Sequence, residues 1–252
     1  MRIDTLSSGG DTKTHLVHTS AVNWVILQSP DGVTLIDGGY PGQSGALIES
    51  LHRVGSSPKE IRAALLTHAH IDHLGGIAKL RAGHDFPVYA GKDEVPHAHR
   101  DYLEQADAAA IAPIAWQPRV LRWLAEIVPL GALSRTGIPD TKALPSKAKL
   151  AALPGAPVAI PVHGHTRGHT AYLVAGGEAV VTGDALITGH MITGHHGPQC
   201  LGPIFTHDTD ENARNLDKLS ATGATIVLPG HGPLWEGPIA DAVAQARTNL
   251  RN

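Results

Sequence analysis

The sequence has very little cysteine, because Cys200 is the single cysteine among 252 residues. One cysteine excludes an intramolecular disulfide framework and a zinc site built from several thiolates, and it is typical of a reducing compartment. Long apolar runs are missing too. No run could cross a bilayer, and residues 1–17 lack the uninterrupted apolar segment of a signal peptide. We therefore expect a cytoplasmic protein that does not enter a membrane.

An excess of charge of one sign is also absent. The chain has 20 Lys and Arg against 23 Asp and Glu, a net charge of -3 with neutral histidine, and no block of like charge. This balance provides no strong field for a polyanion, so we expect a small-molecule substrate and no nucleic-acid partner. With 42% hydrophobic residues, the chain is long enough to bury a proper core, and we predict a single domain over residues 1–252.

Histidine, in contrast, is abundant, with 17 residues placed unevenly. The stretch "THAHIDHLGG" (67–76) contains His68, His70, Asp72 and His73 at the end of an apolar run. His68 and His70 are two residues apart and project to one side of an extended segment, whereas Asp72 and His73 turn into the following helix. Imidazole nitrogens and carboxylate oxygens are preferred zinc ligands. The stretch therefore suits two adjacent divalent ions.

Strand and helix patterns alternate along the chain. An Asp-Gly turn between two apolar runs predicts a hairpin, and apolar residues at helical spacing predict amphipathic helices. Because each half offers strands followed by helices, we predict an α/β (α+β) fold: a four-layer αβ/βα sandwich of two mixed β-sheets flanked by helices. The predicted strands are 21–28, 33–37, 61–68, 86–90, 158–162, 171–176, 178–184 and 225–230, and the helices are 44–54, 77–82, 209–220 and 238–250.

Residues 92–155 differ from the rest, because an alanine-rich, helix-leaning part is followed by a Pro/Gly-rich connection. A connection of this length is usually a lid, a binding element or a disordered segment. We predict a helical insert, with three roles open: a lid over a pocket, a packing element on the body, or a contact in a homodimer. Tyr102, Trp116 and Trp123 would line the pocket under a lid, although aromatic residues at helical spacing more often pack an insert onto its body.

Three later motifs each follow an apolar strand. They are "HGHTRGHT" (163–170) with His169, "VVTGDAL" (180–186) with Asp184, and "IVLPGHG" (226–232) with His231. Loops at strand ends are free to gather around a site. A carboxylate at the end of a buried strand is costly unless it is paired or binds a metal. These motifs therefore strengthen the prediction of a metal site.

Taken in order, these motifs and the Asp37 of "LIDGG" resemble the five motifs of the metallo-β-lactamase fold superfamily, over roughly residues 22–247. The resemblance implies a dinuclear site in which Asp184 bridges two metal ions. It also implies that Asp37 orients a ligand histidine and that His165 supports the ligands without binding metal. The implied ligands are His68, His70 and His169 for the first ion, and Asp72, His73 and His231 for the second.

Two Zn²⁺ ions are the expected cofactors, and iron or manganese would suit the same ligand types. The resemblance implies a hydrolase that uses a metal-bridging hydroxide, with Asp72 as the catalytic group that accepts or relays the proton. The sequence contains no convincing Gly-x-Ser-x-Gly elbow, the motif that would indicate a serine nucleophile. Among esters, lactones, thioesters and amides, we favour a lactone or an ester. A phosphodiesterase, a β-lactamase and a non-heme iron oxidoreductase of the persulfide dioxygenase type are the alternatives on the same fold.

Other side chains are candidates for the substrate pocket. The glycine-rich loop 189–207 should border the metal cleft, although loop histidines more often face solvent. The pocket candidates are His190, His195, His196, Trp116 and Trp123. The histidines expected at the surface or partly packed are His15, His18, His52, His84, His97 and His99.

Overall fold

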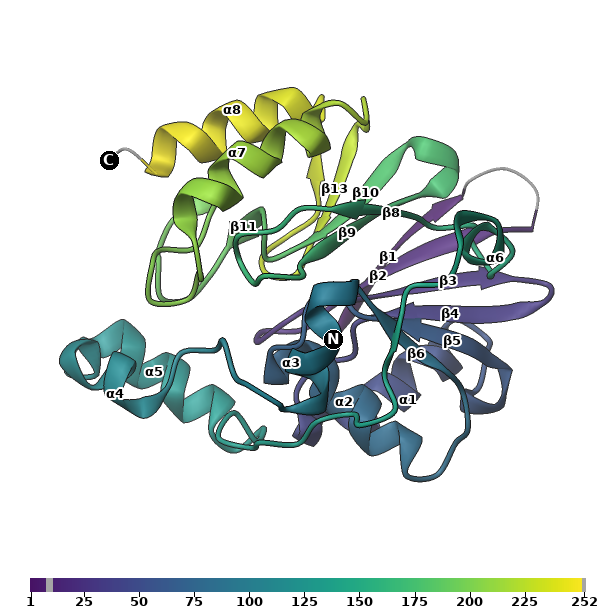
Figure 1. Cartoon of the computed structure of the whole chain (residues 1–252), viewed down its shortest axis with the longest axis horizontal. Helices are drawn as coiled ribbons and strands as arrows, with labels where there is room; N and C mark the ends of the chain where they lie inside the picture. The colour runs from purple at the N-terminus through teal and green to yellow at the C-terminus, as the bar shows by residue number, and fades with distance from the viewer. Residues whose placement is uncertain (8–10, 251–252) are drawn as a thin grey trace.

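A seven-stranded sheet and a five-stranded sheet form the centre of the fold (Figure 1). The computed structural model describes residues 1–7 and 11–250. In the first sheet, strands β1 to β4 pair antiparallel and strands β4 to β7 pair parallel. Its strands, in spatial order, are β1 (Arg2–Ser7), β2 (Lys13–His18), β3 (Trp24–Ser29), β4 (Gly32–Ile36), β5 (Ile61–Leu65), β6 (Val88–Ala90) and β7 (Lys142–Ala143).

The second sheet is also mixed, because β10 pairs parallel with β13 and antiparallel with β9. A separate two-stranded hairpin, β11 (Ile187–Gly189) with β12 (His196–Gln199), follows β10. The strands of the second sheet, in spatial order, are β14 (Trp235–Glu236), β13 (Ile226–Pro229), β10 (Ala179–Gly183), β9 (Thr170–Val174) and β8 (Val158–Pro161).

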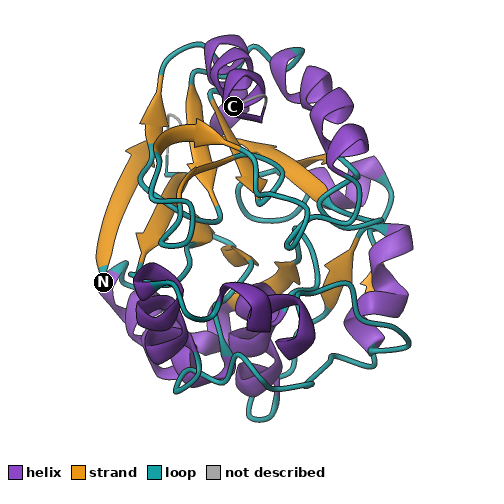
Figure 2. Ribbon diagram, turned by 90° about the vertical axis from the view of Figure 1, so that its left-hand side faces the viewer, coloured by secondary structure: helices purple, strands orange, loops and turns teal. Residues whose placement is uncertain are grey.

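Helices cover the outer faces of both sheets, and the inner faces pack on each other (Figure 2). The helices α1 (Ser44–Arg53) and α2 (Ile71–Arg81) lie against the first sheet, and α7 (Thr209–Ser220) and α8 (Ile239–Leu250) lie against the second. A third buried cluster, which includes Leu65 of β5, Tyr172 of β9 and Val181 of β10, fills the space between the sheets. This confirms the predicted αβ/βα sandwich.

The helix after β5 begins earlier than predicted. We expected it after Gly75-Gly76, but α2 begins at Ile71, directly after His70. The two glycines lie inside the helix because another backbone crosses there: a Cβ on Gly76 would clash with the carbonyl oxygen of Gly38. Glycine therefore serves close packing here rather than a helix start, and α2 begins inside the histidine motif.

Residues 92–155 contain short helices, as expected for a helical insert, and one strand, β7, that we did not predict. The strand β7 extends the first sheet by pairing with β6. Helices α4 and α5 extend to one side, next to the loops that follow the second sheet (Figure 1). Among the described residues, no helix is long and apolar enough to cross a membrane. The helices of this segment are α3 (Val95–His99), α4 (Ala108–Ile111), α5 (Pro118–Ile127) and α6 (Lys147–Ala151).

Candidate metal centre

Loops at the ends of β5, β10 and β13 meet at one edge of the two sheets. The motif that begins at His68 follows β5, Asp184 follows β10 and His231 follows β13. His165 lies in the turn between β8 and β9 and reaches the same place. Because each strand is buried and rigid, the polar side chains just beyond it are held in fixed positions. Histidine and aspartate residues far apart in the chain are thereby brought together.

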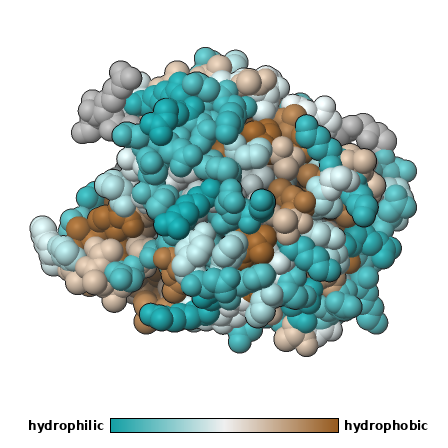
Figure 3. Space-filling model, viewed as in Figure 1, coloured by the Kyte–Doolittle hydropathy of each residue, from teal (hydrophilic) through white to brown (hydrophobic). Residues whose placement is uncertain are grey.

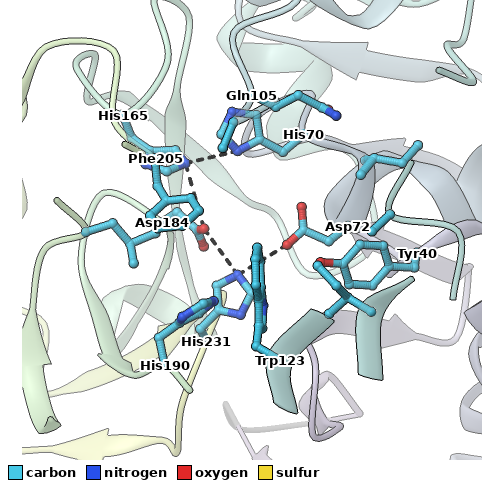
Figure 4. A pocket seen from close by; sticks show the side chains of 15 residues that line it. Tyr40, His70, Asp72, Gln105, Trp123, His165, Asp184, His190, Phe205 and His231 are labelled. Atoms are coloured by element: carbon cyan, nitrogen blue, oxygen red, sulfur yellow. Dashed lines mark hydrogen bonds and ion pairs between the residues drawn. The ribbon is translucent and has the colours of Figure 1, made fainter. Parts of the chain in front are cut away.

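The structure contains three overlapping groups of side chains, and within each group the ligand atoms lie within 4.8 Å of one another. Asp184 lies between the groups: its Oδ1 atom is 3.4 Å from His73 Nε2, and its Oδ2 atom is 3.2 Å from His231 Nε2 and 3.7 Å from His165 Nε2. Figure 4 shows the Asp184 carboxylate facing His165 on one side and His231 on the other. The groups are His68, His70 and His165; His68, His73 and Asp184; and Asp72, His73 and His231.

Several of these imidazoles are anchored through one ring nitrogen. His73 Nδ1 lies 2.8 Å from Asp37 Oδ2, His231 Nδ1 lies 2.9 Å from the Ala21 carbonyl oxygen, and His70 Nε2 lies 2.8 Å from the Glu104 carbonyl oxygen. Each of these contacts leaves the second nitrogen pointing toward the centre. Such anchoring fixes the ring orientation and the tautomer, as it does around metal-bound histidines.

The donor set fits divalent metal ions. The Nε2 atoms of His68 and His73 and the Oδ1 atom of Asp184 are buried without a hydrogen-bond partner in the described chain. Unpartnered buried polar atoms are costly unless a bound ion or water satisfies them. Two nitrogens on one tetrahedral zinc ion, each about 2.0–2.1 Å from it, lie about 3.3 Å apart. The His165 Nε2 to His70 Nδ1 distance of 3.2 Å matches this spacing.

The structure corrects the sequence interpretation of His165 and His169. We expected His169 to bind metal and His165 to support it, but His165 joins His68 and His70 in the cluster. The Nε2 atom of His169 instead accepts a hydrogen bond from the backbone N–H of Asp184, at 3.2 Å. This hydrogen bond ties His169 to the Asp184 loop.

Asp37 lies where the resemblance predicted a carboxylate that orients a ligand. Besides the contact with His73, its Oδ1 atom accepts from the Thr67 backbone N–H at 2.8 Å, and its Oδ2 atom accepts from the Thr67 hydroxyl at 2.7 Å. Its backbone has a φ of 63°, a left-handed conformation that aspartate tolerates better than most residues. Asp37 therefore links the end of β4 to the histidine motif after β5.

Sequence reasoning missed Glu94, which is completely buried. Its Oε1 atom accepts from the Ala69 N–H and lies near His97 Nδ1, both at 2.7 Å. Its Oε2 atom accepts from the Thr166 hydroxyl at 2.7 Å and from the Gly168 N–H at 3.0 Å. Burial raises the pKa of Glu94, but these hydrogen bonds outweigh it and hold the pKa below its ordinary value. One carboxylate thus holds both histidine-bearing loops.

No local pattern in "GKDEVPHAHR" indicates this role, because the partners of Glu94 lie up to 74 residues away. His97 was also misplaced by the sequence analysis. We expected it at the surface or partly packed, but it is fully buried beside Glu94. A buried carboxylate needs such partners to remain ionised.

The protonation states divide the cluster into two halves. Burial lowers the pKa of His68 and His165 well below the usual value, and burial together with His97 lowers that of His70 to about 4. These three rings are neutral at pH 7, the form that binds metal.

The other half carries positive charge when metal is absent. Burial lowers the pKa of His231, but Asp184 and Asp72 outweigh it and raise the value to about 9. Burial likewise opposes protonation of His73, yet Asp184, Asp37 and Asp72 raise its pKa well above the usual value. Burial raises the pKa of Asp184, but His231 and His73 hold it far below its ordinary range, so this carboxylate is ionised.

A cavity of about 80 Å³ opens onto the cluster. Its lining includes the polar side chains of Asp72, Asp184 and His231 and the aromatic rings of Trp123 and Phe205 (Figure 4). The other lining residues are Tyr40, His70, Ile71, Gln105, Ala106, Ile127, Ala132, His165, His190 and Leu201.

Of the five pocket candidates, the structure brings His190 and Trp123 to this cavity and leaves the other three outside. Trp116 is 76% exposed, and its Nε1–H donates to the Pro113 carbonyl oxygen, which holds the ring at a surface turn. His195 lies near Asn249 of α8, with its Nε2 atom 2.9 Å from the Asn249 side-chain nitrogen. His196 is exposed in β12. The prediction that these three residues line the pocket is wrong.

Comparison with known proteins agrees with this geometry. A family model described as the metallo-beta-lactamase superfamily matches residues 19–231. The probable metallo-hydrolase YflN of Bacillus subtilis is 29% identical over 229 residues, which cover 86% of this chain and 81% of that protein. A hydroxyacylglutathione hydrolase of Bdellovibrio bacteriovorus is 32% identical over 94 residues, or 36% of each protein.

Solved structures share the fold at low sequence identity. A metallo-beta-lactamase of Cronobacter sakazakii with a HARLDQ motif superposes with a TM-score of 0.65 at 20% identity, covering 94% of this chain and 90% of that one. The family match includes Asp37, the histidine motif, Asp184 and His231. The chain therefore belongs to the metallo-beta-lactamase superfamily.

Proposed function

We propose that the protein is a dinuclear metal-dependent hydrolase of a small acyl-type substrate, with an ester or a lactone favoured over a thioester or an amide. The observation that carries this proposal is the convergence of five imidazoles and two carboxylates at the floor of a cavity. Relatives named hydroxyacylglutathione hydrolases and fold neighbours named metallo-beta-lactamases act, by their names, on acyl thioesters and β-lactams. Both reactions break a bond between an acyl carbon and a heteroatom.

We assign each proposed metal ion a set of residues, and the spacing of the donor atoms supports this assignment. His68, His70 and His165 would hold one ion, and Asp72, His73 and His231 would hold the other, with Asp184 shared. Two zinc ions there would supply Lewis acidity, which polarises a carbonyl group and provides hydroxide at neutral pH. In the overall reaction, the acyl C–O bond breaks, the acyl carbon gains OH from water, and the leaving oxygen gains the remaining proton.

Asp72 is the residue placed to move that proton. It lines the cavity, its side chain is 15% exposed, and its Oδ2 atom lies 3.4 Å from His231 Nε2. Burial raises the pKa of Asp72, but the effects of His73 and His231 are larger and hold the pKa below its ordinary value. The carboxylate is therefore ionised at pH 7. An ionised carboxylate that faces both the ligands and the substrate space can accept the proton of water and return it to the leaving oxygen.

Tyr40 gives the cavity a hydrogen-bond donor. Its hydroxyl faces the space beside Asp72 (Figure 4). Burial raises the pKa of this hydroxyl well above its ordinary value, and the charges of Asp72 and Asp184 add to the shift. The phenol therefore keeps its proton and can donate to the carbonyl or leaving oxygen of a bound ester.

The lining of the cavity favours an uncharged substrate. No Lys or Arg occurs among the described residues around it, whereas Ile127, Leu201 and Phe205 form apolar walls. A phosphodiester would find no Lys or Arg there to add to the charge of the metal ions. The match to the hydroxyacylglutathione hydrolase of Bdellovibrio covers about a third of the chain, which gives less support to a glutathione thioester than to a simple ester or lactone.

Zinc analysis and a substrate panel test this proposal. The zinc-loaded protein and its Asp184→Asn variant are assayed on a lactone, an ester, a thioester, a β-lactam and a phosphodiester. His195→Ala, which changes a solvent-facing histidine outside the cavity, is the matched control. We expect two zinc ions per chain, turnover of the lactone or ester, and loss of at least about 100-fold in Asp184→Asn only. Hydrolysis confined to the phosphodiester, or equal turnover by Asp184→Asn, would contradict it.

A further inference from the structure

A second, larger cavity of about 540 Å³ lies against α4 and α5. It shares Gln105, Ala106, Trp123, Ile127 and Ala132 with the cavity above the metal cluster. Because five residues border both spaces, the second cavity lies directly beside the first. We name it the alkyl groove. Its volume lies within the range of small-molecule sites, about 300–1,000 Å³.

The walls of the alkyl groove are almost entirely apolar. Gln105, Asp107 and Arg135 are its three polar members, and the others are aliphatic residues and Trp123. Leu133, 73% exposed, and Val128, 42% exposed, present their side chains there without cover from the described chain. Figure 3 shows hydrophobic residues gathered on this side of the molecule, over α4 and α5. Exposed apolar surface of this kind commonly marks a binding site.

Gln105 stands at the junction of the two cavities and carries an unmet hydrogen-bonding group. Its Oε1 atom is buried and accepts no hydrogen bond within the described chain. A buried amide without a partner is costly.

We propose that the alkyl groove binds the alkyl tail of the acyl group, so that the substrate is a medium-chain ester or lactone. This rests on the proposed function, because the reacting carbonyl lies at the metal cluster. The position of the groove beside the cavity above that cluster favours a substrate tail over a second copy of the chain, because Trp123 and Ile127 line both spaces.

The proposal predicts how turnover depends on chain length. Each methylene removed from water strengthens binding by up to about fourfold. For the zinc-loaded protein, we expect kcat/KM to rise about two- to fourfold per methylene from butanoyl to decanoyl esters. The solvent-exposed sides of the groove should keep the gain below the full value.

A matched pair of variants on α4 tests the groove itself. Ala108 lines the groove, and its neighbour Ala109 is exposed and does not. Ala108→Phe should fill the groove and flatten the rise of kcat/KM with chain length to less than twofold per two methylenes. Ala109→Phe should keep the wild-type slope. Zinc content and the unfolding midpoint of both variants show that each is folded and loaded.

Direct binding separates this proposal from the proposed function. Calorimetry of the zinc-loaded protein with butanoate, octanoate and decanoate needs no hydrolysis, and we expect tighter binding with each added carbon, lost in Ala108→Phe. If no ester is hydrolysed but the chain-length dependence of binding remains, the proposed function fails and the groove stands. If esters are hydrolysed with equal kcat/KM at all lengths, the groove is overturned and the function stands. Dissociation of a dimer by Ala108→Phe, without chain-length dependence, would assign the surface to a second copy and also overturn it.

Discussion

The Nδ1 nitrogen of His73 lies 2.8 Å from the Oδ2 oxygen of Asp37, and both side chains are buried. This pair joins the end of β4 to the first turn of α2, where His73 follows His70 and Asp72. The same carboxylate also accepts two hydrogen bonds from Thr67. The orientation of His73, a proposed metal ligand, therefore depends on Asp37, which lies outside the proposed ligand set.

Replacing Asp37 by Asn tests this dependence. Asparagine has the same shape and tolerates the left-handed backbone at this position, so the change removes the negative charge opposite His73 together with one of the two acceptor oxygens. We expect zinc affinity to fall by about 10- to 100-fold, as for other residues that orient ligand histidines. Chelator competition measures the affinity. Asp4→Asn, at a partly exposed Asp4–His18 pair, is the control, and an equal effect in both variants would contradict the assignment.

Paired alanine variants distinguish the roles of His165 and His169. Removing His165 deletes a ligand of the first ion, so we expect bound zinc to fall from two ions per chain to one. Removing His169 deletes the acceptor for the Asp184 N–H, which should cost about 1–3 kcal/mol of stability and leave two zinc ions bound. Elemental analysis and urea unfolding measure the two effects. Loss of one zinc ion from His169→Ala and none from His165→Ala would show that the sequence interpretation, in which His169 binds metal, was right.

Glu94→Gln should destabilise the protein strongly for a single isosteric change. The amide has one acceptor oxygen and turns an NH₂ group toward the donors that Glu94 now accepts. Leaving buried donors unsatisfied costs about 1–3 kcal/mol. Denaturant unfolding of the metal-free protein gives the loss. Glu49→Gln changes an exposed i,i+4 pair with Arg53 and should alter stability by less than about 0.5 kcal/mol. Equally small losses of unfolding free energy in both variants would show that Glu94 does not hold the two histidine-bearing loops.

Zinc binding should release protons at pH 7. The raised pKa values of His73 and His231, the latter about 9, mean that both rings are protonated in the metal-free protein and must lose their protons to bind metal. We expect release of about two protons per chain and zinc affinity that rises with pH up to about 9. Calorimetry in buffers of different ionisation enthalpy counts the protons, and heats that do not depend on the buffer would refute the prediction.

The same shifts set the pH dependence of the metal-free fold. Both folded-state pKa values lie above the unfolded value of about 6.5. The stabilisation from these protonated rings is therefore fully present below pH 6.5 and is lost as pH rises toward 9. A metal-free protein that gains stability between pH 6.5 and 9 would contradict this sign.

The sequence predicted the features that local spacing encodes. The hairpin of β3 and β4, the helices α1, α7 and α8, and the histidine motif after β5 all follow from periodicity, turn residues and ligand spacing. Gly-His-Thr, however, occurs twice between β8 and β9, at 164–166 and 168–170. Spacing could not decide which of the two histidines joins the cluster. The outcome depends on a contact between distant segments, the hydrogen bond from the Asp184 backbone N–H to His169 Nε2.

Contacts between distant segments explain the other errors. Glu94 is buried by partners on two loops that its own neighbourhood does not indicate, and α2 begins early because Gly76 packs on Gly38. Trp116 fits an apolar helix face in the sequence, yet it lies at the turn before α5 with its ring in solvent. Such outcomes depend on tertiary packing rather than on local preference.

Anomalous diffraction from crystals of the zinc-loaded protein tests the central claim most directly. The account predicts two zinc peaks about 3.5–4 Å apart. One should be bound by His68, His70 and His165, the other by Asp72, His73 and His231, with Asp184 reaching both. No anomalous peak within this cluster, or a first peak bound by His169 in place of His165, would contradict it.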